Sequence, residues 1–481
     1  MKMKKFASVL LSGLMAASAV PFNAATLPYS SFIASAAENS AAAEIASGKC
    51  GENASFFLDS EGTLTISGTG YMKQPKELYM PEEENLFLQT PKYSVKKIVI
   101  EEGITEIGMQ AFNKLSEVTS LTLPESLEAI NLNAFEGCAS LKSVKIPDSV
   151  TSLGWCSFAN CTSLEEVILP NNDEYTCISV FANCDNLNSI SLGDKTTHIP
   201  EYLFAQCSGL KEITIPDGIK DIGIAAFSEC INLENVIIPD SVKIIAPVAF
   251  SDCTSLKTIT IPENVSTIGK GAFLDCPALT EINVDSENSY FTSADGVLFN
   301  KDKTALVQYP EGKGNGYIIP ESVTEINEMA FSDCDDLSSI TLHKNINKIG
   351  SSAFEECNNL TSIIFCNPEC KIFDDAYTIP ENTIIYGYAG STAQEYAEKY
   401  EREFVVLDEK APELKPTLLG DANCDEIVSL ADAAAIFQSI GNYDKYALSE
   451  QGAVNADIYE PGSGITPLDA ITIMQIEAGI L

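Results

Sequence analysis

The sequence has few of the residues and motifs that usually carry catalysis. Its 481 residues include only two histidines, His198 and His343, and neither has a serine or cysteine nearby in a recognisable catalytic context. A nucleophile elbow, an HExxH helix, a Walker loop and a dinucleotide-binding fingerprint are all missing. Carboxylates are too abundant for any one pair to indicate a glycosidase. We therefore expect both histidines to lie at surface turns of a protein that is not an enzyme.

Basic charge is also scarce. The chain has 29 lysines and arginines against 68 aspartates and glutamates, which gives a formal net charge of -39. So acidic a surface repels nucleic acids and anionic membranes, and it suits calcium and basic or neutral partners. The simpler alternative is that the charge only keeps a secreted protein soluble.

Long apolar runs are confined to the start of the chain. Residues 1–36 combine a basic start, an apolar core of signal-peptide length and a small-residue cleavage site at Ala34-Ser35-Ala36, with a rival site at Ala17-Ser18-Ala19. No later stretch is long and apolar enough to span a bilayer. We expect an exported, extracellular protein that does not insert into a membrane.

What the sequence does contain is a repeat of 23 residues. A phenylalanine recurs at this spacing from Phe112 to Phe273, and the pattern resumes with Phe331 and Phe354. If each phenylalanine is position 1 of a unit, a leucine falls at position 7 and aliphatic residues fall at positions 10 and 12. A fixed period in the twenties is typical of a solenoid, whose units bury their apolar faces only by stacking on one another.

The alternation within a unit predicts how each rung is built. Positions 9 and 11 are polar and flank the aliphatic positions, which is the pattern of a strand with one buried face. A proline such as Pro147 or Pro216 follows and ends the strand, because proline cannot donate to a ladder. A second aliphatic pair, as in Val150 and Leu153, lines the returning segment. We expect successive rungs to pair as a parallel sheet about 4.8 Å apart.

These units, of the form IPxSVTxIGxxAFxxC, resemble the BspA-like, Treponema-type leucine-rich repeats. The resemblance covers residues 96–407 and implies an α+β repeat fold, a leucine-rich-repeat solenoid with a parallel β-sheet. Within it, residues 285–318 interrupt the period and carry the turn signals of a β-hairpin insertion, a feature that this family often shows.

The ends of the repeat array differ from its middle. Residues 47–95 contain a β-hairpin that we interpret as an N-terminal cap, followed by a connection; a small-residue spacer ending at Ser47 precedes the cap. Residues 383–407 contain an amphipathic helix with Ser391 as its N-cap and a last strand, which would close the far end. Residues 408–418 read as a short, stiff linker.

Most of the 15 cysteines belong to the repeat. Nine of them occupy position 4 of a unit, between the phenylalanine and the leucine: Cys138, Cys161, Cys184, Cys207, Cys230, Cys253, Cys276, Cys334 and Cys357. We expect these to be small buried residues, because parallel side chains on stacked rungs suit disulfide geometry poorly. Cys366 and Cys370 could pair or stay unpaired, and two thiols alone do not make a structural zinc site.

Residues 419–481 lack the repeat and contain two loop-plus-helix segments. In the first, alternate residues supply oxygen ligands as in a 12-residue calcium loop, because a tightly turning loop points every second residue at one ion. Its candidate ligands are Asp421, Asn423, Asp425, Ile427 through its carbonyl, Ser429 through a water, and Asp432. The second loop offers Asn455, Asp457, Tyr459, Ser463 and Asp469. It is longer and lacks an acid at the fifth position, so the first site fits calcium more fully.

The paired half-EF-hand loops, each ending in aspartate, resemble a dockerin. The resemblance implies a small all-α module with two Ca²⁺ sites that binds a cohesin domain on the scaffoldin of a cellulosome, a polysaccharide-degrading complex. By their place in the motif, the cohesin-binding residues are Leu430, Ala431, Phe437, Gln438, Pro467, Leu468, Met474 and Gln475. The alternative is that Leu430, Phe437 and Met474 are core residues of the module.

The outward strand positions indicate what the solenoid could bind. The twenty residues at positions 9 and 11 of the ten units include no aromatic side chain. Pyranose rings are usually held by stacking on exposed aromatics, so a polysaccharide platform on the strand face is not expected. A protein ligand suits this small-polar face better, unless the face is only solvated and the array is a spacer.

Together these features predict a secreted, non-catalytic leucine-rich-repeat binding or adhesion protein that a calcium-dependent dockerin attaches to a scaffoldin cohesin. The alternative is a free secreted adhesin that calcium only stabilises. A cellulosomal hydrolase has less support, since the only argument for it is that most dockerin-bearing proteins are hydrolases. We expect the protein on the cell-surface cellulosome of an anaerobic bacterium, where many free thiols would persist.

Overall fold

The computed structural model describes residues 42–78, 91–172 and 177–407 and, further on, residues 422, 428–441, 448, 453, 455–457, 465 and 467–477. The chain divides into two compact units, the first ending at Val405 and the second beginning at Val406. The expected secretory signal and the expected linker lie outside the described residues. Among the helices of the described part, none is long and apolar enough to cross a membrane.

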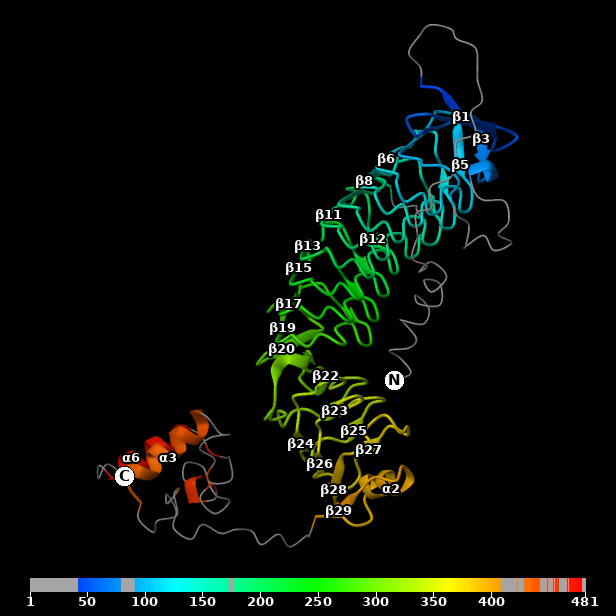
Figure 1. Ribbon diagram of the computed structural model, residues 1–481. Helices are drawn as coiled ribbons and strands as arrows, with labels where there is room; N and C mark the ends of the chain where they lie inside the picture. The colour runs from blue at the N-terminus through cyan, green and yellow to red at the C-terminus, as the bar shows by residue number, and fades with distance from the viewer. Residues whose placement is uncertain are drawn as a thin grey trace. The chain divides into compact units, whose positions relative to one another are not determined.

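Two rows of short strands run along the first unit (Figure 1). The first row contains positions 9–11 of the units and consists of β4 (Lys97–Ile100), β6 (Ser120–Thr122), β8 (Ser143–Lys145), β10 (Glu166–Ile168), β11 (Ser189–Ser191), β13 (Glu212–Thr214), β15 (Asn235–Ile237), β17 (Thr258–Ile261), β19 (Glu281–Val284), β24 (Ser339–Leu342), β26 (Ser362–Phe365) and β28 (Ile384–Gly387). The second row, on the returning segments, consists of β5 (Ile104–Ile107), β7 (Ala129–Ile130), β9 (Ser152–Leu153), β12 (His198–Ile199), β14 (Asp221–Ile222), β16 (Ile244–Ile245), β18 (Thr267–Ile268), β23 (Glu325–Ile326), β25 (Lys348–Ile349) and β27 (Lys371–Ile372).

Strands of neighbouring units pair in parallel, one unit apart in sequence. Glu166 of β10, for example, lies opposite Ser189 of β11, and Glu212 of β13 lies opposite Asn235 of β15. Alternation buries one face of each strand: in β8, Val144 is buried while the residues on either side of it are exposed. The parallel solenoid predicted from the repeat is confirmed.

Sharp corners two residues before and two residues after each phenylalanine fold a unit back on itself. Around Phe158 these corners are Cys156 and Asn160, whose φ angles are 53° and 59°. The rungs approach closely at the first corner, where a Cβ added to Gly154 would lie 2.3 Å from the backbone nitrogen of Leu132. A side chain at Gly154 would force the backbone to shift, which favours glycine at the end of this returning strand; other units have Asn131, Cys177 or Ala246 at the same place.

The repeat phenylalanines stack on one another inside the solenoid. From Phe112 to Phe273, successive ring centroids are 4.9 to 6.0 Å apart and the ring planes differ by at most 23°. Stacked aromatic pairs contribute about 0.5–1.5 kcal/mol beyond the area they bury. The stack therefore holds the rungs in register as well as filling the core.

The position-4 cysteines are buried, as predicted, and most of them also bond to the neighbouring rung. In eight of the nine, the thiol lies within bonding distance of the carbonyl oxygen of the phenylalanine 26 residues earlier; for Cys161 and Phe135 the Sγ···O distance is 3.4 Å. All fourteen cysteines in the described residues are free thiols, including Cys366 and Cys370.

The N-terminal cap contains one strand more than predicted. It consists of β1 (Glu44–Lys49), β2 (Asn53–Asp59), β3 (Thr63–Met72) and the short 3₁₀ turn η1 (Lys76–Leu78). β1 pairs antiparallel with β2, so the interpretation of the residues before Ser47 as a spacer is wrong from Glu44 onward. The sequence of β1 is small and polar, and it becomes a strand because β2 offers it an edge. β3 pairs with both β4 and β5, so it covers the first rung of both rows.

The interruption of the repeat forms the predicted hairpin and, in addition, a third strand. Its elements are β20 (Phe291–Ala294), β21 (Val297–Asn300), β22 (Ala305–Gln308) and the 3₁₀ turn η3 (Glu311–Lys313). β20 and β21 are antiparallel, and β22 runs parallel to β23 in the second row. Tyr309 stacks on Phe331 with a centroid distance of 5.0 Å, so a tyrosine fills the place of a repeat phenylalanine.

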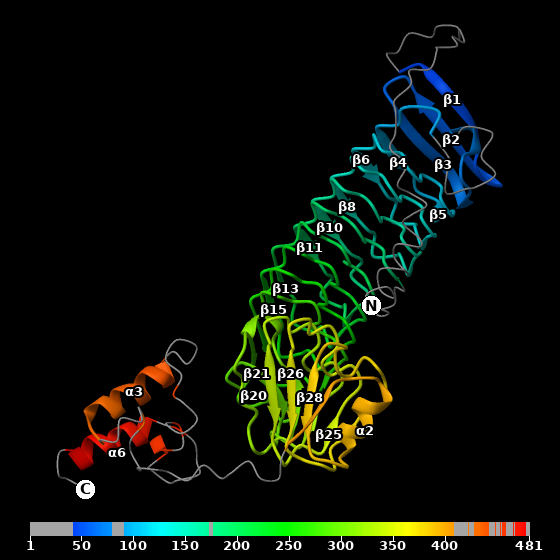
Figure 2. The same ribbon diagram turned by 60° about the horizontal axis from the view of Figure 1, so that its bottom comes forward.

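β21 lies where the earlier rungs, in green, meet the later rungs, in yellow (Figure 2). It borders two apolar clusters within the first unit. Leu298 belongs to the cluster formed by the earlier rungs, whereas Val297 and Phe299 belong to the cluster formed by the later rungs. Successive residues of a strand point to opposite faces, so this single strand borders both cores.

The last rungs are covered by α2 (Thr392–Lys399) and β29 (Phe404–Val406). Ser391 is the N-cap of α2, and its Oγ accepts a hydrogen bond from the backbone N–H of Gln394. The hydroxyl of Tyr396 donates to the carbonyl of Asp375 over 2.8 Å, which fixes the helix on the final rung.

Candidate functional site

The second unit brings two aspartates to equivalent places on two helices. These are α3 (Leu430–Gly441) and α6 (Pro467–Glu477), and the unit's core is formed by Ala422, Ala433, Ile436, Ala456, Ala470 and Ile473. Asp432 is the third residue of α3 and Asp469 is the third residue of α6, and both side chains are fully buried. The backbone N–H of Ser429 donates to Asp432 Oδ2 over 2.8 Å, which holds this carboxylate at the start of α3.

Of the predicted calcium ligands in the second loop, the structure describes Asn455, Asp457 and Asp469. Asn455 is buried and Asp457 is half-buried. The remaining predicted ligands of both loops lie outside the described residues: Asp421, Asn423, Asp425, Ile427, Tyr459 and Ser463. In the part of the chain that is described, no three His, Cys, Asp or Glu side chains gather in a group that could hold a metal ion. Carboxylate and amide oxygens are the donors that Ca²⁺ prefers, so the described residues fit calcium chemically, and the two sites stay a prediction.

The predicted cohesin-binding residues lie on α3 and α6, and two of them have described side chains. Gln438 is exposed, and Met474 is 45% exposed, so Met474 is not a core residue. The side chains of Leu430, Ala431, Phe437, Pro467, Leu468 and Gln475 are outside the described part. Two further exposed apolar residues, Ile440 on α3 and Ile471 on α6, were not predicted, because helical spacing alone does not show which face a small module covers.

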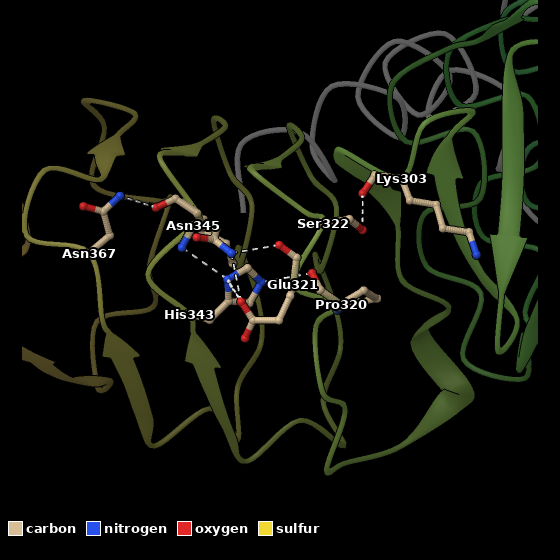
Figure 3. Close-up of polar contacts among 8 residues, drawn as sticks. Lys303, Pro320, Glu321, Ser322, His343, Asn345 and Asn367 are labelled. Atoms are coloured by element: carbon tan, nitrogen blue, oxygen red, sulfur yellow. Dashed lines mark hydrogen bonds and ion pairs between the residues drawn. The ribbon is translucent and has the colours of Figure 1, made fainter. Parts of the chain in front are cut away.

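His343 bonds to the previous rung and is half-buried, which corrects the expectation of a surface turn residue (Figure 3). Its Nε2 lies 3.0 Å from the carbonyl oxygen of Pro320, and its Nδ1 accepts from the backbone N–H of Asn345 over 3.3 Å. The proton of the neutral ring is therefore on Nε2, which donates to Pro320. The Glu321 carboxylate lies 3.7 Å from Nδ1.

The side chains around His343 belong to a ladder of hydrogen bonds between turns (Figure 3). Asn345 donates to the carbonyl of Glu321, and Asn367 donates to the carbonyl of Ile346 on the preceding rung. His343 stands at position 13, where most other units have proline, and joins its turn to the one before. His198, the other histidine, is half-buried in β12 rather than at a turn. These contacts show structural roles for His343 and its neighbours.

The outward face of the first-row strands extends into the N-terminal cap, where an aromatic residue lies. The pairing of β2, β3, β4 and β6 places Phe57, Thr65, Val99 and Thr122 in one line across the sheet. Phe57 is 40% exposed. The twenty repeat positions contain no aromatic residue, but the continuous face that includes the cap contains Phe57. This residue could not be found from the sequence, because the repeat pattern does not show how the cap pairs with the first rungs.

A shallow hollow of about 540 Å³ opens on the strand face at the beginnings of β11, β13 and β15. β11 and β13 belong to different sheets. Its lining is Asn188, Gly209, Lys211, Glu212, Glu234 and Asn235. Lys257 donates to Glu234 over 2.6 Å, and this hydrogen bond and charge lower the pKa of the Glu234 carboxyl. The hollow is polar and its side chains are mostly exposed, so it offers hydrogen bonds to a polar ligand but little apolar contact.

Comparison with known proteins assigns the repeats to a family. The sequence matches the family described as BspA type leucine rich repeat region (6 copies) over residues 83–208, 174–294 and 314–383, more than half of the chain. The chain belongs to this family of BspA-type leucine-rich repeat proteins. The interval between the matched stretches, residues 295–313, contains β21, β22 and Tyr309, where the repeat is interrupted.

Solved structures with a similar fold include a leucine rich cell surface protein from Faecalibacterium prausnitzii and a leucine-rich repeat protein from Bacteroides ovatus. Both are 23% identical to this BspA-type chain, with TM-scores of 0.42 and 0.43. The likeness covers 75% and 74% of this chain and 94% and 98% of the two others.

A curated relative of a different kind matches a short stretch. Over 67 residues, 12% of this BspA-type chain, the sequence is 45% identical to a protein named xylanase/beta-glucanase from Ruminococcus flavefaciens. The chain spans 8% of the length of that relative.

Proposed function

We propose that this BspA-type protein is a secreted, non-catalytic binding or adhesion protein and that its residues 419–481 are a calcium-dependent dockerin. The dockerin would attach it to a cohesin on the scaffoldin of a cellulosome-type, polysaccharide-degrading complex. The repeats would then present their outer surfaces to a separate ligand.

The observation that carries the proposal is the matched burial of Asp432 and Asp469 at the third residue of α3 and of α6. Burying a carboxylate is costly unless a cation or hydrogen bonds compensate for the lost water. Ca²⁺ supplies such a positive charge when bound. Residues 421–432 would hold one ion, and Asn455, Asp457 and Asp469 with the loop between them would hold the other, so that each loop is tied to the helix that follows it.

The match to the xylanase/beta-glucanase also supports the proposal. The aligned stretch is 67 residues long, which is the size of one small module. An attachment module is the kind of segment that an enzyme and a non-catalytic protein of one complex would share. Ile440, Ile471 and Met474 are exposed on α3 and α6, and exposed apolar side chains on a small module suit a protein contact.

The test is a calorimetric titration of the full mature chain with purified cohesins from cellulosomal scaffoldins, first with calcium and then with EDTA. We expect binding that requires calcium and that a variant carrying both Asp432→Asn and Asp469→Asn loses. The matched control is Asp240→Asn, which removes one exposed aspartate from a repeat turn and should bind like the native chain.

Two results would contradict the proposal in different ways. If no cohesin binds although calcium stabilises the second unit, the protein is a free adhesin. If the purified chain hydrolyses any of a panel of plant polysaccharides, it is an enzyme and the non-catalytic part of the proposal is wrong.

A further inference from the structure

A line of mostly apolar side chains runs along one corner of the solenoid, outside both strand rows. We call it the corner ridge: the residues three before the repeat phenylalanines from Phe112 to Phe250, which are Met109, Leu132, Trp155, Ile178, Glu201, Ile224 and Pro247. The ridge ends at the next rung, where the same place holds the charged Lys270; Glu328 and Ser351 stand there before Phe331 and Phe354. Met109, Trp155 and Ile178 are large apolar residues with 40–50% of their surface exposed. Trp155 is the single tryptophan of the chain.

Backbone hydrogen bonds place these side chains on consecutive rungs. Asn133 donates to the carbonyl of Trp155 over 2.9 Å, and Tyr202 donates to the carbonyl of Ile224 over 2.8 Å. Each ridge residue therefore lies directly beside the next, about 4.8 Å away, and the seven rungs make a mostly apolar line of about 29 Å.

The corner ridge is almost uncharged, although the protein is strongly acidic. The ridge residues and their two chain neighbours on each of the seven rungs are 21 residues, of which Glu201 alone is charged. Charged residues make up 20% of the whole chain, so about four would be expected here. The occupant of this surface therefore need not carry any charge, whereas most of the remaining surface favours a cationic partner.

The ridge is too narrow to join two copies of the chain stably. A strip about 29 Å long and about 10 Å wide buries about 600 Å² when two copies meet, against the roughly 1,200 Å² of a specific interface. A thin, extended polymer covers such a strip far better than a globular partner does.

Two aromatic residues lie two rungs apart on this corner. Trp155 is exposed, and Tyr202 lies partly exposed over a small cluster that contains Ala182 and Ala205. Their separation along the solenoid is about 10 Å, which matches two sugar rings of an extended chain. Aromatic rings stack on the apolar faces of pyranose rings, and the aliphatic residues between them offer further apolar contact without charge.

We propose that the corner ridge binds an extended, uncharged β-linked polysaccharide chain, with Trp155 as its main stacking platform and Tyr202 contacting a sugar ring two positions along. The polymer lies across the rungs, parallel to the solenoid axis. This site is separate from the strand face, and it does not depend on residues 419–481 being a dockerin.

Tryptophan fluorescence of the full chain tests the site directly, because Trp155 is the one emitting indole. Titration with cellohexaose or xylohexaose should give a saturable shift of the emission, and cellobiose should bind more weakly because it spans fewer rungs. The acidic oligosaccharide hexagalacturonate should leave the emission unchanged. Calorimetry should show at least a tenfold loss of affinity for the neutral hexasaccharides in Trp155→Ala and a smaller loss in Trp155→Tyr.

The control variant is Phe57→Ala, which removes an aromatic residue of similar exposure from the strand face and should bind both hexasaccharides like the native chain. Thermal melting shows whether each variant is folded. The proposal is overturned if no neutral oligosaccharide binds, if Trp155→Ala binds as well as the native chain, or if Phe57→Ala loses binding equally. It is also overturned if sedimentation velocity shows a dimer of the native chain that dissociates in Trp155→Ala, because the ridge would then be a contact between copies.

Discussion

The cysteine at position 4 of the unit is explained by what its thiol contacts. A buried carbonyl oxygen has two lone pairs and gains stability from each hydrogen bond that it accepts, and the corner after each phenylalanine places its carbonyl near the next rung. A cysteine is small enough for this place and carries one weak donor. The S–H group of Cys207 lies 3.2 Å from the carbonyl oxygen of Phe181, with both residues fully buried.

We expect Cys207→Ala to lower the free energy of unfolding by about 1–2 kcal/mol, because it removes the donor to Phe181 and leaves a small void. Cys207→Ser keeps a donor and should cost less. Urea unfolding of the three proteins measures the difference. Equal losses in the two variants would show that the size of the side chain, and not the hydrogen bond, selects cysteine.

The buried thiols also predict a marked loss of stability in alkaline solution. Burial raises the pKa of Cys161 and of Cys230 from 9.0 to about 12. Above pH 9 the unfolded chain therefore releases protons that the folded chain retains, so stability is complete below pH 9 and falls as the pH rises towards 12. Each such thiol contributes about 1.4 kcal/mol per pH unit to this fall.

Urea unfolding at pH 8 and at pH 10 measures this dependence. A variant carrying Cys161→Ala and Cys230→Ala is less stable at pH 8 but should lose less stability between the two pH values than the native chain does. Lysines and tyrosines titrate alike in both proteins, so the difference isolates the two thiols. The same pH dependence in both proteins would contradict the raised pKa values.

Some side-chain positions could be predicted and others could not. The burial of the nine cysteines follows from their place between two core residues. The contact of His343 with Pro320 is not visible in the sequence, because the partners are 23 residues apart and belong to different rungs. The position of Phe57 could not be predicted for the same reason, since its place beside the repeat strands depends on the pairing of β2, β3 and β4.

At the scale of the strands, the interrupted repeat is where two apolar cores meet. β21 borders two apolar clusters, and Tyr309 continues the aromatic stack of the later one. The hairpin was predictable from its turn residues. The third strand was not, because Tyr309 lies 22 residues before Phe331 and is not a phenylalanine, so it falls outside the period.

We expect Tyr309→Ala to destabilise the later rungs by about 3–5 kcal/mol, the usual cost of emptying a large buried aromatic site. The rungs before β21 should be affected much less, because their cluster does not contain Tyr309. Amide hydrogen exchange of the full chain resolves the two regions. The matched change Phe250→Ala should reverse the pattern, and uniform loss of protection in both variants would show that the two clusters unfold as one.

As a whole molecule, the chain combines the long first unit, which contains the repeats, with a small second unit of different chemistry. The repeat and its parallel sheet could be predicted from periodicity alone, since each 23-residue repeat has the same pattern of apolar and polar positions. The second unit is recognised by the spacing of oxygen-bearing residues, and its helices α3 and α6 begin where those loops end. What the helices present to a partner depends on packing, as the exposed Ile440 and Ile471 show.

Calcium removal should act on the second unit alone. At a calcium concentration of about 100 times the dissociation constant, each of the two proposed sites would add about 2.7 kcal/mol to the stability of the second unit. In scanning calorimetry of the full chain, EDTA should therefore lower the unfolding temperature of the second unit and leave the transition of the repeats in place. A variant with both Asp432→Asn and Asp469→Asn should show the low transition with or without calcium. A shift of the repeat transition by EDTA would place a calcium site in the solenoid. No shift of either transition would mean that Asp432 and Asp469 stabilise the starts of α3 and α6 without a metal.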